Sequence, residues 1–243
     1  MYDLAEHLAG WVHDQVIEGG GQGVVFGVSG GVDSAVIAAL AKRAFAEHTL
    51  GVLMPCHSDP QDAADGALVA ERVGVPFVTV DLAPTFDVLA RSIAAASPGM
   101  LQSRLALANV KPRLRMTTLY ALANELGYFV VGSSNRSELA VGYFTKYGDS
   151  GVDLLPLADL VKHEVRELAH SLGVPQHIID KPPSAGLWAG QSDEDDMGLS
   201  YEELDACLLT SLGSEDVRLK VAAMHAGSEH KRALPRMAPR AIP

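Results

Sequence analysis

Short apolar runs alternate with longer segments of helical periodicity through the first half of the chain. Four such runs occupy residues 24–28, 50–54, 77–80 and 128–131. Runs of this length are typical of strands that are covered on both faces, and strands that alternate with helices form a parallel sheet. The pattern therefore predicts an α/β fold, an open parallel sheet with helices on both faces.

The predicted helices lie between and after these strands. We expect them at residues 35–46, 61–73, 84–95 and roughly 101–126. A later helix is predicted to begin near Lys162, because apolar residues recur at helical spacing from Val161 to Leu172 and Gly173 follows. This places the Lys162 ammonium close to a helix start, where the helix dipole disfavours a cation.

The sequence contains no internal repeat and no convincing linker, so we expect a single domain over residues 1–243. The C-terminal segment from about residue 228, "SEHKRALPRMAPRAIP", differs in character. Prolines at 235, 239 and 243 interrupt any helix there. We expect this segment to be irregular and mobile.

Charge and cysteine content exclude several classes of protein. The formal net charge of the 243 residues is -11, whereas a general nucleic-acid binder carries a basic face. The two cysteines, Cys56 and Cys207, lie far apart, which is typical of a reducing compartment. No apolar run approaches the roughly 18 residues of a membrane span. We therefore predict a cytoplasmic protein with neither nucleic acid nor a membrane as its partner.

The stretch "GVSGGVDS", residues 27–34, follows the first predicted strand and opens a helix. Free backbone N–H groups and the positive end of the helix dipole favour an anion at such a turn, and glycines let a phosphate approach the backbone. Asp33 would repel a bare phosphate, but Mg²⁺ is commonly held between carboxylates and phosphates. The stretch therefore predicts a nucleotide–magnesium site. The alternative is a tight turn in which Asp33 caps the helix.

This loop is neither a Walker A loop, because its lysine is missing, nor a GxGxxG turn. "SGGVDS" resembles the pyrophosphatase loop of the PP-loop ATP pyrophosphatases, which cleave ATP between the α and β phosphates. Four later blocks resemble ammonia-dependent NAD⁺ synthetase: "NVKPRLRMTTLY", "VVGSSNRSELAVGYFTKYGDSGVDLLPLADLVK", "KPPSAGLWAGQSDEDDMG" and "SEHKR". The resemblance covers nearly the whole chain.

The resemblance implies both a fold and a reaction. The fold would be of the adenine nucleotide alpha hydrolase-like, Rossmann-like type. The enzyme would be a carbon–nitrogen ligase that converts deamido-NAD⁺ (nicotinic acid adenine dinucleotide) to NAD⁺. ATP would first adenylate the nicotinate carboxylate and release pyrophosphate, and ammonia would then displace AMP. Family members are homodimers, so a second copy of the chain is the implied partner.

The resemblance also implies roles at the ATP site. ATP would be bound by Gly27, Val28, Ser29, Gly30, Gly31, Val32, Asp33, Ser34, Ser133, Lys162 and Ser184. Asp33 and Lys162 would be catalytic, and Asp33 and Glu138 would hold Mg²⁺. Many family members carry threonine in place of Ser133 and Ser184. The residues alone leave alternatives open: Glu138 could be a solvated acid in a first helical turn, and Lys162 an exposed surface lysine.

The dinucleotide site implied by the resemblance contains Arg113, Lys146, Asp153, His230 and Lys231. Cations suit a ligand that carries a pyrophosphate and a free carboxylate. The acidic stretch "SDEDD", residues 192–196, is most simply a solvated loop, and we assign it no catalytic residue.

Two rival functions remain open on the sequence. One is a PP-loop enzyme that acts on another acid or on tRNA. The negative net charge argues against tRNA, and the block "YFTKYGDSGVDLLP" argues against other acids. The other is a regulatory module that binds nucleotide without catalysis. The presence of Asp33, Glu138 and Lys162 argues against that module.

Overall fold

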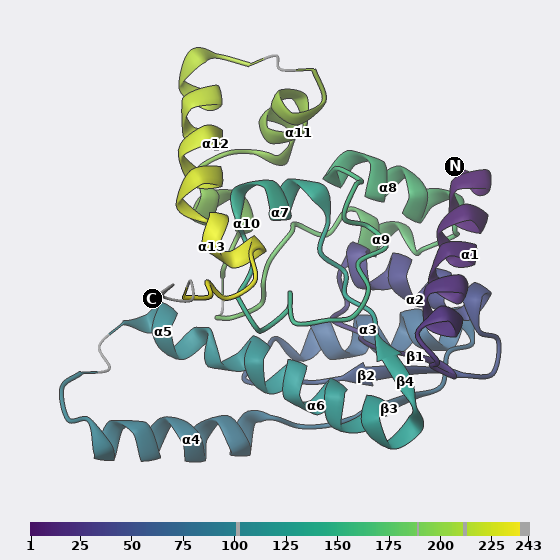
Figure 1. Ribbon diagram of the computed structural model, residues 1–243, viewed down its shortest axis with the longest axis horizontal. Coiled ribbons are helices and arrows are strands. Elements are labelled where there is room, and N and C mark those ends of the chain that lie inside the picture. The colour runs from purple at the N-terminus through teal and green to yellow at the C-terminus, as the bar shows by residue number, and fades with distance from the viewer. Residues whose placement is uncertain (101–102, 189, 211–212, 239–243) are drawn as a thin grey trace, which may run out of the picture.

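The computed structural model describes residues 1–100, 103–188, 190–210 and 213–238. Four parallel strands form one sheet in the order β3-β2-β1-β4 (Figure 1). Their bounds are β1 Gly23–Gly27, β2 Thr49–Leu53, β3 Phe77–Thr79 and β4 Tyr128–Val130. The predicted α/β fold is confirmed, and each strand lies within one residue of its predicted range.

The helices of the described residues account for most of the remaining chain. They are α1 Tyr2–Glu18, α2 Val32–Ala44, α3 Pro60–Val73, α4 Ala83–Ala96, α5 Arg104–Ala108, α6 Val110–Leu126, α7 Arg136–Val141, α8 Lys162–Ser171, α9 Gln176–Ile179, α10 Asp193–Met197, α11 Tyr201–Thr210, α12 Glu215–Gly227 and α13 Glu229–Arg232. The helices predicted at 35–46, 61–73 and 84–95 are confirmed, as is the helix that begins at Lys162.

The single helix predicted over residues 101–126 is wrong. Residues 101 and 102 lie outside the described residues, and the rest forms α5 and α6, which meet at Asn109. Pro112 explains the break, because its nitrogen has no hydrogen to donate to the carbonyl of Ala108 in a continuous helix. In the first turn of a new helix that missing donor costs little.

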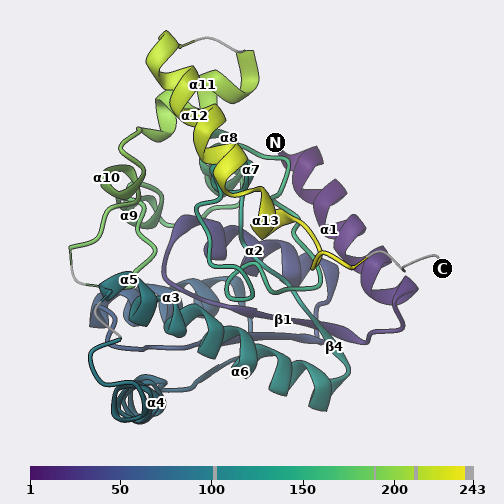
Figure 2. The same ribbon diagram turned by 60° about the vertical axis from the view of Figure 1, so that its left-hand side comes forward.

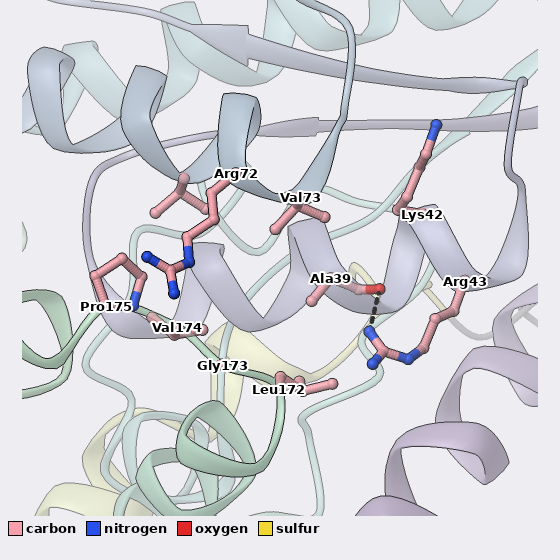
Figure 3. A pocket seen from close by; sticks show the side chains of 10 residues that line it. Ala39, Lys42, Arg43, Arg72, Val73, Leu172, Gly173, Val174 and Pro175 are labelled. Carbon is pink, nitrogen blue, oxygen red and sulfur yellow. Dashed lines mark hydrogen bonds between the residues drawn. The ribbon is translucent and has the colours of Figure 1, made fainter.

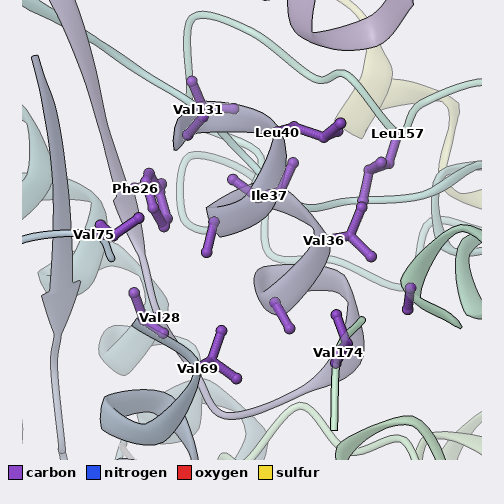
Figure 4. Close-up of a cluster of buried hydrophobic side chains, with 14 of the residues drawn as sticks. Phe26, Val28, Val36, Ile37, Leu40, Val69, Val75, Val131, Leu157 and Val174 are labelled. Carbon is purple, nitrogen blue, oxygen red and sulfur yellow. The ribbon is translucent and has the colours of Figure 1, made fainter. Parts of the chain in front are cut away.

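Alternate residues of the central strand β1 face opposite sides of the sheet. Val24 and Phe26 belong to the core shared with α1, α2 and α8, part of which Figure 4 shows. Val25 belongs to a second cluster with Leu119 and Ala123 of α6 on the other face. Both faces are thus covered at the centre. The edge strand β3 departs from the prediction, since Val78 is 42% exposed.

The C-terminal segment is more ordered than predicted. Residues Glu229–Arg232 form the short helix α13 (Figure 2), so the expectation of a wholly irregular segment is wrong. Ser228 is buried, and Arg232 donates from Nη1 to the carbonyl oxygen of Leu139 at 3.0 Å. The three prolines all come after this turn, which is why it can form. Mobility of the later residues stays a prediction, and residues 239–243 lie outside the described part.

The order of the strands places the candidate site. The chain adds β2 and β3 on one side of β1 and then crosses over to add β4 on the other. At such a switch point the loops that follow the two neighbouring strands run in opposite directions. Ligands bind in the space between them, beyond the carboxyl ends of the strands. The stretches 27–34 and 131–138 include the loops after β1 and β4 and the first turns of α2 and α7. Within the described ranges, no helix has the length and apolar character that crossing a membrane requires.

Candidate active site

The loop between β1 and α2 is held in a shape that leaves the helix N-terminus open. Gly30 has a φ of 79°, a left-handed conformation that favours glycine. Gly31 precedes α2 as its N-cap and supplies no side-chain acceptor for the first amide groups. These amides can therefore bind an anion. The alternative in which Asp33 caps the helix is wrong, because its carboxylate turns to other partners.

Two serine hydroxyls brace this loop. Ser29 Oγ donates to Ser34 Oγ at 3.0 Å, and Ser34 Oγ donates to the carbonyl oxygen of Gly31 at 3.0 Å. The amide of Gly31 also donates to Ser29 Oγ at 3.3 Å. Ser34 is buried, whereas Ser29 is exposed. These hydrogen bonds fix the shape of the loop, and the exposed Ser29 keeps a hydroxyl at its surface.

The structure brings together the three residues predicted for catalysis and metal binding. Lys162 is the first residue of α8, and its side chain is 3% exposed. Its Nζ lies 2.6 Å from Asp33 Oδ2 and 3.3 Å from Glu138 Oε1. The alternatives of a surface lysine and a freely solvated acid are therefore wrong for Lys162 and Glu138. The Asp33 carboxylate comes from α2, and the Glu138 carboxylate from α7.

Charge pairing determines the protonation of this cluster. Burial alone would lower the pKa of Lys162, but Asp33 and Glu138 outweigh it and hold that pKa above its usual value. Burial raises the pKa of the Glu138 carboxyl, Lys162 opposes the rise, and Asp33 adds to it. The lysine is thus always charged at neutral pH. One ammonium faces two carboxyl groups, so the cluster can accept further positive charge.

Asn135 completes the cluster, and sequence reasoning missed it. It is fully buried, and its Nδ2 donates to Asp33 Oδ1 and to Glu138 Oε1, both at 2.9 Å. Asn135 also caps α7 in a capping box with Glu138. The N-x-x-E spacing in "SSNRSE" could have revealed the cap, but not the bridge to Asp33.

A third acid lies behind Glu138, contrary to the predicted solvated loop at 192–196. Residues Asp193–Met197 form the helix α10, and Asp193 is 5% exposed. The Tyr201 hydroxyl donates to Asp193 Oδ2 at 3.1 Å and to Glu138 Oε1 at 3.4 Å. Lys162 Nζ lies 4.9 Å from the centroid of the Tyr201 ring. No periodicity in the sequence marks Asp193 as the acid that becomes buried.

Four of the five residues predicted for the dinucleotide form one cluster, and Asp153 lies apart from it. Arg113 donates from Nη2 to the carbonyl oxygen of Lys146 at 3.2 Å, and Lys146 donates to that of His230. Lys231 donates to two carbonyl oxygens of the loop after α7, which also holds Lys146. Asp153 is not joined to this cluster by any contact between described residues. Its carboxylate accepts from the Tyr120 hydroxyl at 2.9 Å and from the amide of Val130 at 2.8 Å.

The two predicted serine ligands lie on separate loops. Ser133 follows β4 and precedes the N-cap of α7. Ser184 is exposed, and its Oγ accepts from the amide of Gly186 at 3.1 Å. Neither hydroxyl contacts the lysine–carboxylate cluster within the described residues.

A pocket of about 370 Å³ opens at the other end of α2 (Figure 3). Lys42, Arg43 and Arg72 line it together with apolar side chains. These cations lie in the last turns of α2 and α3, where they counter the negative end of each helix dipole. Arg43, for example, donates to the carbonyl oxygen of Ala39 at 3.2 Å. The pocket shares no residue with the loop 27–34 and is separate from the candidate site.

Replacing the Asn135 amide with a carboxylate tests whether further negative charge in the cluster destabilises the folded protein. Asn135→Asp keeps a good N-cap but places a third carboxylate between Asp33 and Glu138. We expect the free energy of unfolding to fall by about 1–3 kcal/mol, and to fall more at about pH 8 than at about pH 5, where the new acid can protonate. Denaturant unfolding at both pH values measures this.

The matched control is Asn109→Asp, because Asn109 Oδ1 accepts from Thr145 Oγ1 at 2.8 Å and a carboxylate can do the same. We expect little change in that variant. Equal losses in the two variants, without dependence on pH, would contradict the account.

Comparison with known proteins places the chain in a family. Residues 4–235 match the family described as NAD synthase. The NH(3)-dependent NAD(+) synthetase of Carboxydothermus hydrogenoformans is 47% identical over 233 residues, which cover 96% of each protein. The solved NMN synthetase from Francisella tularensis is 36% identical with a TM-score of 0.92 and covers 98% of both chains. The NAD+ synthetase from Burkholderia pseudomallei is 31% identical with a TM-score of 0.80, over 96% of this chain and 90% of its own. The chain therefore belongs to the NAD synthase family.

Proposed function

We propose that this protein is a carbon–nitrogen ligase that amidates deamido-NAD⁺ to NAD⁺, using ATP and ammonia. The observation that carries the proposal is the position of Lys162, Asp33 and Glu138 at the open N-terminus of α2. An amide-lined loop with a buried cation beside it suits the phosphates of ATP. The family and the 47% identical NH(3)-dependent NAD(+) synthetase support deamido-NAD⁺ as the acceptor.

The first chemical step needs positioning more than acid–base catalysis. An oxygen of the nicotinate carboxylate attacks the α-phosphorus of ATP, the bond to the bridging oxygen of the β-phosphate breaks, and pyrophosphate leaves. The loop amides and the Lys162 ammonium stabilise the charge that builds up on the phosphates. Lys162 is suited to this because its neighbouring acids keep it charged. Ser133 and Ser184 are proposed as further contacts of ATP.

The second step forms the amide. Ammonia attacks the acyl carbon, a carbon–nitrogen bond forms, and the bond to the AMP oxygen breaks as AMP takes the electron pair. The nitrogen then releases a proton. The acidic cluster around Glu138 and Asp193 would favour a cationic ammonium ion nearby.

Asp33 and Glu138 are the residues that we propose hold Mg²⁺. The described residues contain no group of three or more acidic, histidine or cysteine side chains that could enclose a metal. Two carboxylates nevertheless fit Mg²⁺, which commonly completes its shell with water and substrate phosphates. The excess of carboxyl groups over Lys162 also leaves room for a cation. Bound there, the metal would neutralise charge on the phosphates.

We propose the cluster of Arg113, Lys146, His230 and Lys231 as the dinucleotide site. Three of these residues are lysine or arginine, in a chain with a net charge of -11. Their mutual contacts bring α6, the loop after α7, and α13 together. We also propose Asp153 as an acceptor for ribose hydroxyls of the dinucleotide, although its carboxylate already accepts two hydrogen bonds.

A second candidate substrate is nicotinate mononucleotide, which lacks the AMP half of deamido-NAD⁺. The observation in its favour is the TM-score of 0.92 to the NMN synthetase, against 0.80 to the NAD+ synthetase from Burkholderia pseudomallei. The amidation chemistry would be the same. The curated relative at 47% identity favours the dinucleotide.

We also propose that the enzyme is a homodimer that uses α4 as part of its interface. No described residue of α4 is buried, and Val88 is 57% exposed. A hollow of about 490 Å³ on this helix is lined by Pro84, Thr85, Val88, Leu89 and Ser92. Figures 1 and 2 both place α4 at the outer edge of the molecule, beyond α6. An exposed apolar helix face of this kind commonly marks a protein interface.

We propose the cytoplasm as the place of action. Cys56 and Cys207 both carry free thiols, which suits a reducing compartment. Burial also raises the pKa of the Cys56 thiol above its usual value, against the influence of nearby cations. That thiol is therefore protected from oxidation rather than reactive.

The products of the reaction test the proposed function. With Mg-ATP, ammonium and deamido-NAD⁺, the protein should form NAD⁺, AMP and pyrophosphate in equal amounts. Asp33→Asn should lower turnover by roughly 100-fold or more and leave the circular dichroism spectrum unchanged. Asp159→Asn, at an exposed position, should match the unmodified protein. Stoichiometric ADP would contradict the proposal, and a higher kcat/KM for nicotinate mononucleotide would select the second substrate.

Light scattering tests the dimer. We expect twice the chain mass of 25.7 kDa and a shift to monomer in Val88→Glu, because the new charge would be buried at the interface. Ile17→Glu is the matched control, since Ile17 on α1 is 53% exposed. A dimer that survives Val88→Glu would exclude α4 from the interface.

A further inference from the structure

Lys181 joins two parts of the fold that lie far apart in the sequence. Its Nζ lies 2.8 Å from Asp62 Oδ1 and 2.7 Å from Asp65 Oδ2. Both aspartates belong to the first two turns of α3, whereas Lys181 opens the segment 181–188. The Lys181 side chain is 28% exposed, but that of Asp65 is only 4% exposed. One partner is thus fixed in the protein interior.

The same turns of α3 support the phosphate-binding loop from behind. A Cβ atom at Gly30 would lie 2.3 Å from the carbonyl oxygen of Asp62 and 3.1 Å from Asp65 Cβ. Only glycine therefore fits against α3 at this point of the loop. A displacement of Asp62 or Asp65 would therefore displace Gly30 as well, because atoms packed this closely leave no free space between them.

The charges of this contact are matched. Burial opposes ionisation of Asp65, but hydrogen bonds from Lys181 and Gln61 outweigh it and hold its pKa below the usual value. Burial likewise works against the Lys181 ammonium, and Asp62 and Asp65 outweigh it, so that its pKa is raised. A further titratable neighbour is His177, whose Nε2 lies 3.6 Å from Asp65 Oδ1. The Lys181 ammonium is thus paired with two carboxylates of α3.

We propose that Lys181 is a positioning residue for ATP, which sets the distance between the loop 27–34 and the segment that carries Ser184. This proposal rests on the proposed function, because it takes both elements as the two sides of the ATP site. Ser184 lies three residues beyond Lys181, so its Cα lies within about 10 Å of the Lys181 Cα. Anchoring the lysine therefore limits where the Ser184 hydroxyl can lie. Lys181 itself contacts α3 and no residue of the lysine–carboxylate cluster among the described residues.

The C-terminal end of the segment 181–188 is held by its own contacts and contains a tryptophan that can report on its position. Lys111 donates from Nζ to the carbonyl oxygen of Leu187 at 2.6 Å. The Arg104 guanidinium carbon lies 4.6 Å from the centroid of the Trp188 ring. The segment is therefore attached at both ends, with the exposed Ser184 between them. Because the chain has two tryptophans, a Trp11→Phe background makes Trp188 a single fluorescent probe of this segment.

The experiment compares Lys181→Met, Lys181→Arg and Asp62→Asn in the Trp11→Phe background. Loss of the anchor should raise KM for ATP by roughly tenfold and change kcat by less than about twofold, because the lysine acts on binding geometry and touches no reacting atom. Acrylamide should quench Trp188 more strongly in Lys181→Met. Arginine can pair with both carboxylates, so Lys181→Arg should restore both values. Asp62→Asn removes one partner and should shift them in the same direction.

Lys42→Met is the control, since Lys42 lines the separate pocket at the other end of α2. It should behave like the background protein. Unchanged KM and quenching in Lys181→Met would overturn the proposal, as would a fall in kcat alone. If Lys181→Met does not fold, the same readouts on Asp62→Asn decide. If the background protein forms no NAD⁺, the proposed function fails. The anchor is then still tested by Trp188 quenching and by equilibrium dialysis, which measures the affinity for Mg-ATP.

Discussion

The contact of Lys162 with Asp33 and Glu138 is the interaction on which the site depends. A buried cation at a helix N-terminus is unfavourable by itself, both through desolvation and through the helix dipole. Two carboxylates make it stable, and each comes from a different element, α2 or α7. The ion pairs therefore fix three helix N-termini around one point. That point lies beyond the carboxyl ends of β1 and β4.

Such a cluster is better suited to ligand binding than to stability. Replacing a buried ion pair with apolar residues commonly costs nothing, whereas removing one partner leaves a buried charge. Here one lysine faces two acids, and Asp193 lies behind them with its own pKa raised by burial. The cluster thus contains more carboxyl groups than cations, which is the feature on which the proposed metal site rests. This arrangement is consistent with the proposed binding of ATP at the N-terminus of α2.

Much of this could be predicted from the sequence, because strands, helix periodicity and the glycine loop are local signals. The strands at 24–28 and 128–131 placed Asp33 and Glu138 at one edge of the sheet, and helical spacing placed Lys162 at a helix start. Asn135 and Asp193 were missed because their burial depends on tertiary contacts with Asp33 and Tyr201. The break at Asn109 could have been predicted from Pro112, because proline disrupts the interior of a helix.

The central claim is that the loop and Lys162 direct the acid substrate to the α-phosphorus of ATP. Deamido-NAD⁺ labelled with oxygen-18 in its nicotinate carboxylate tests this most directly. If the carboxylate attacks the α-phosphorus, one labelled oxygen must appear in the phosphate of the AMP product. AMP without label, or label in inorganic phosphate with ADP as the other product, would contradict the account.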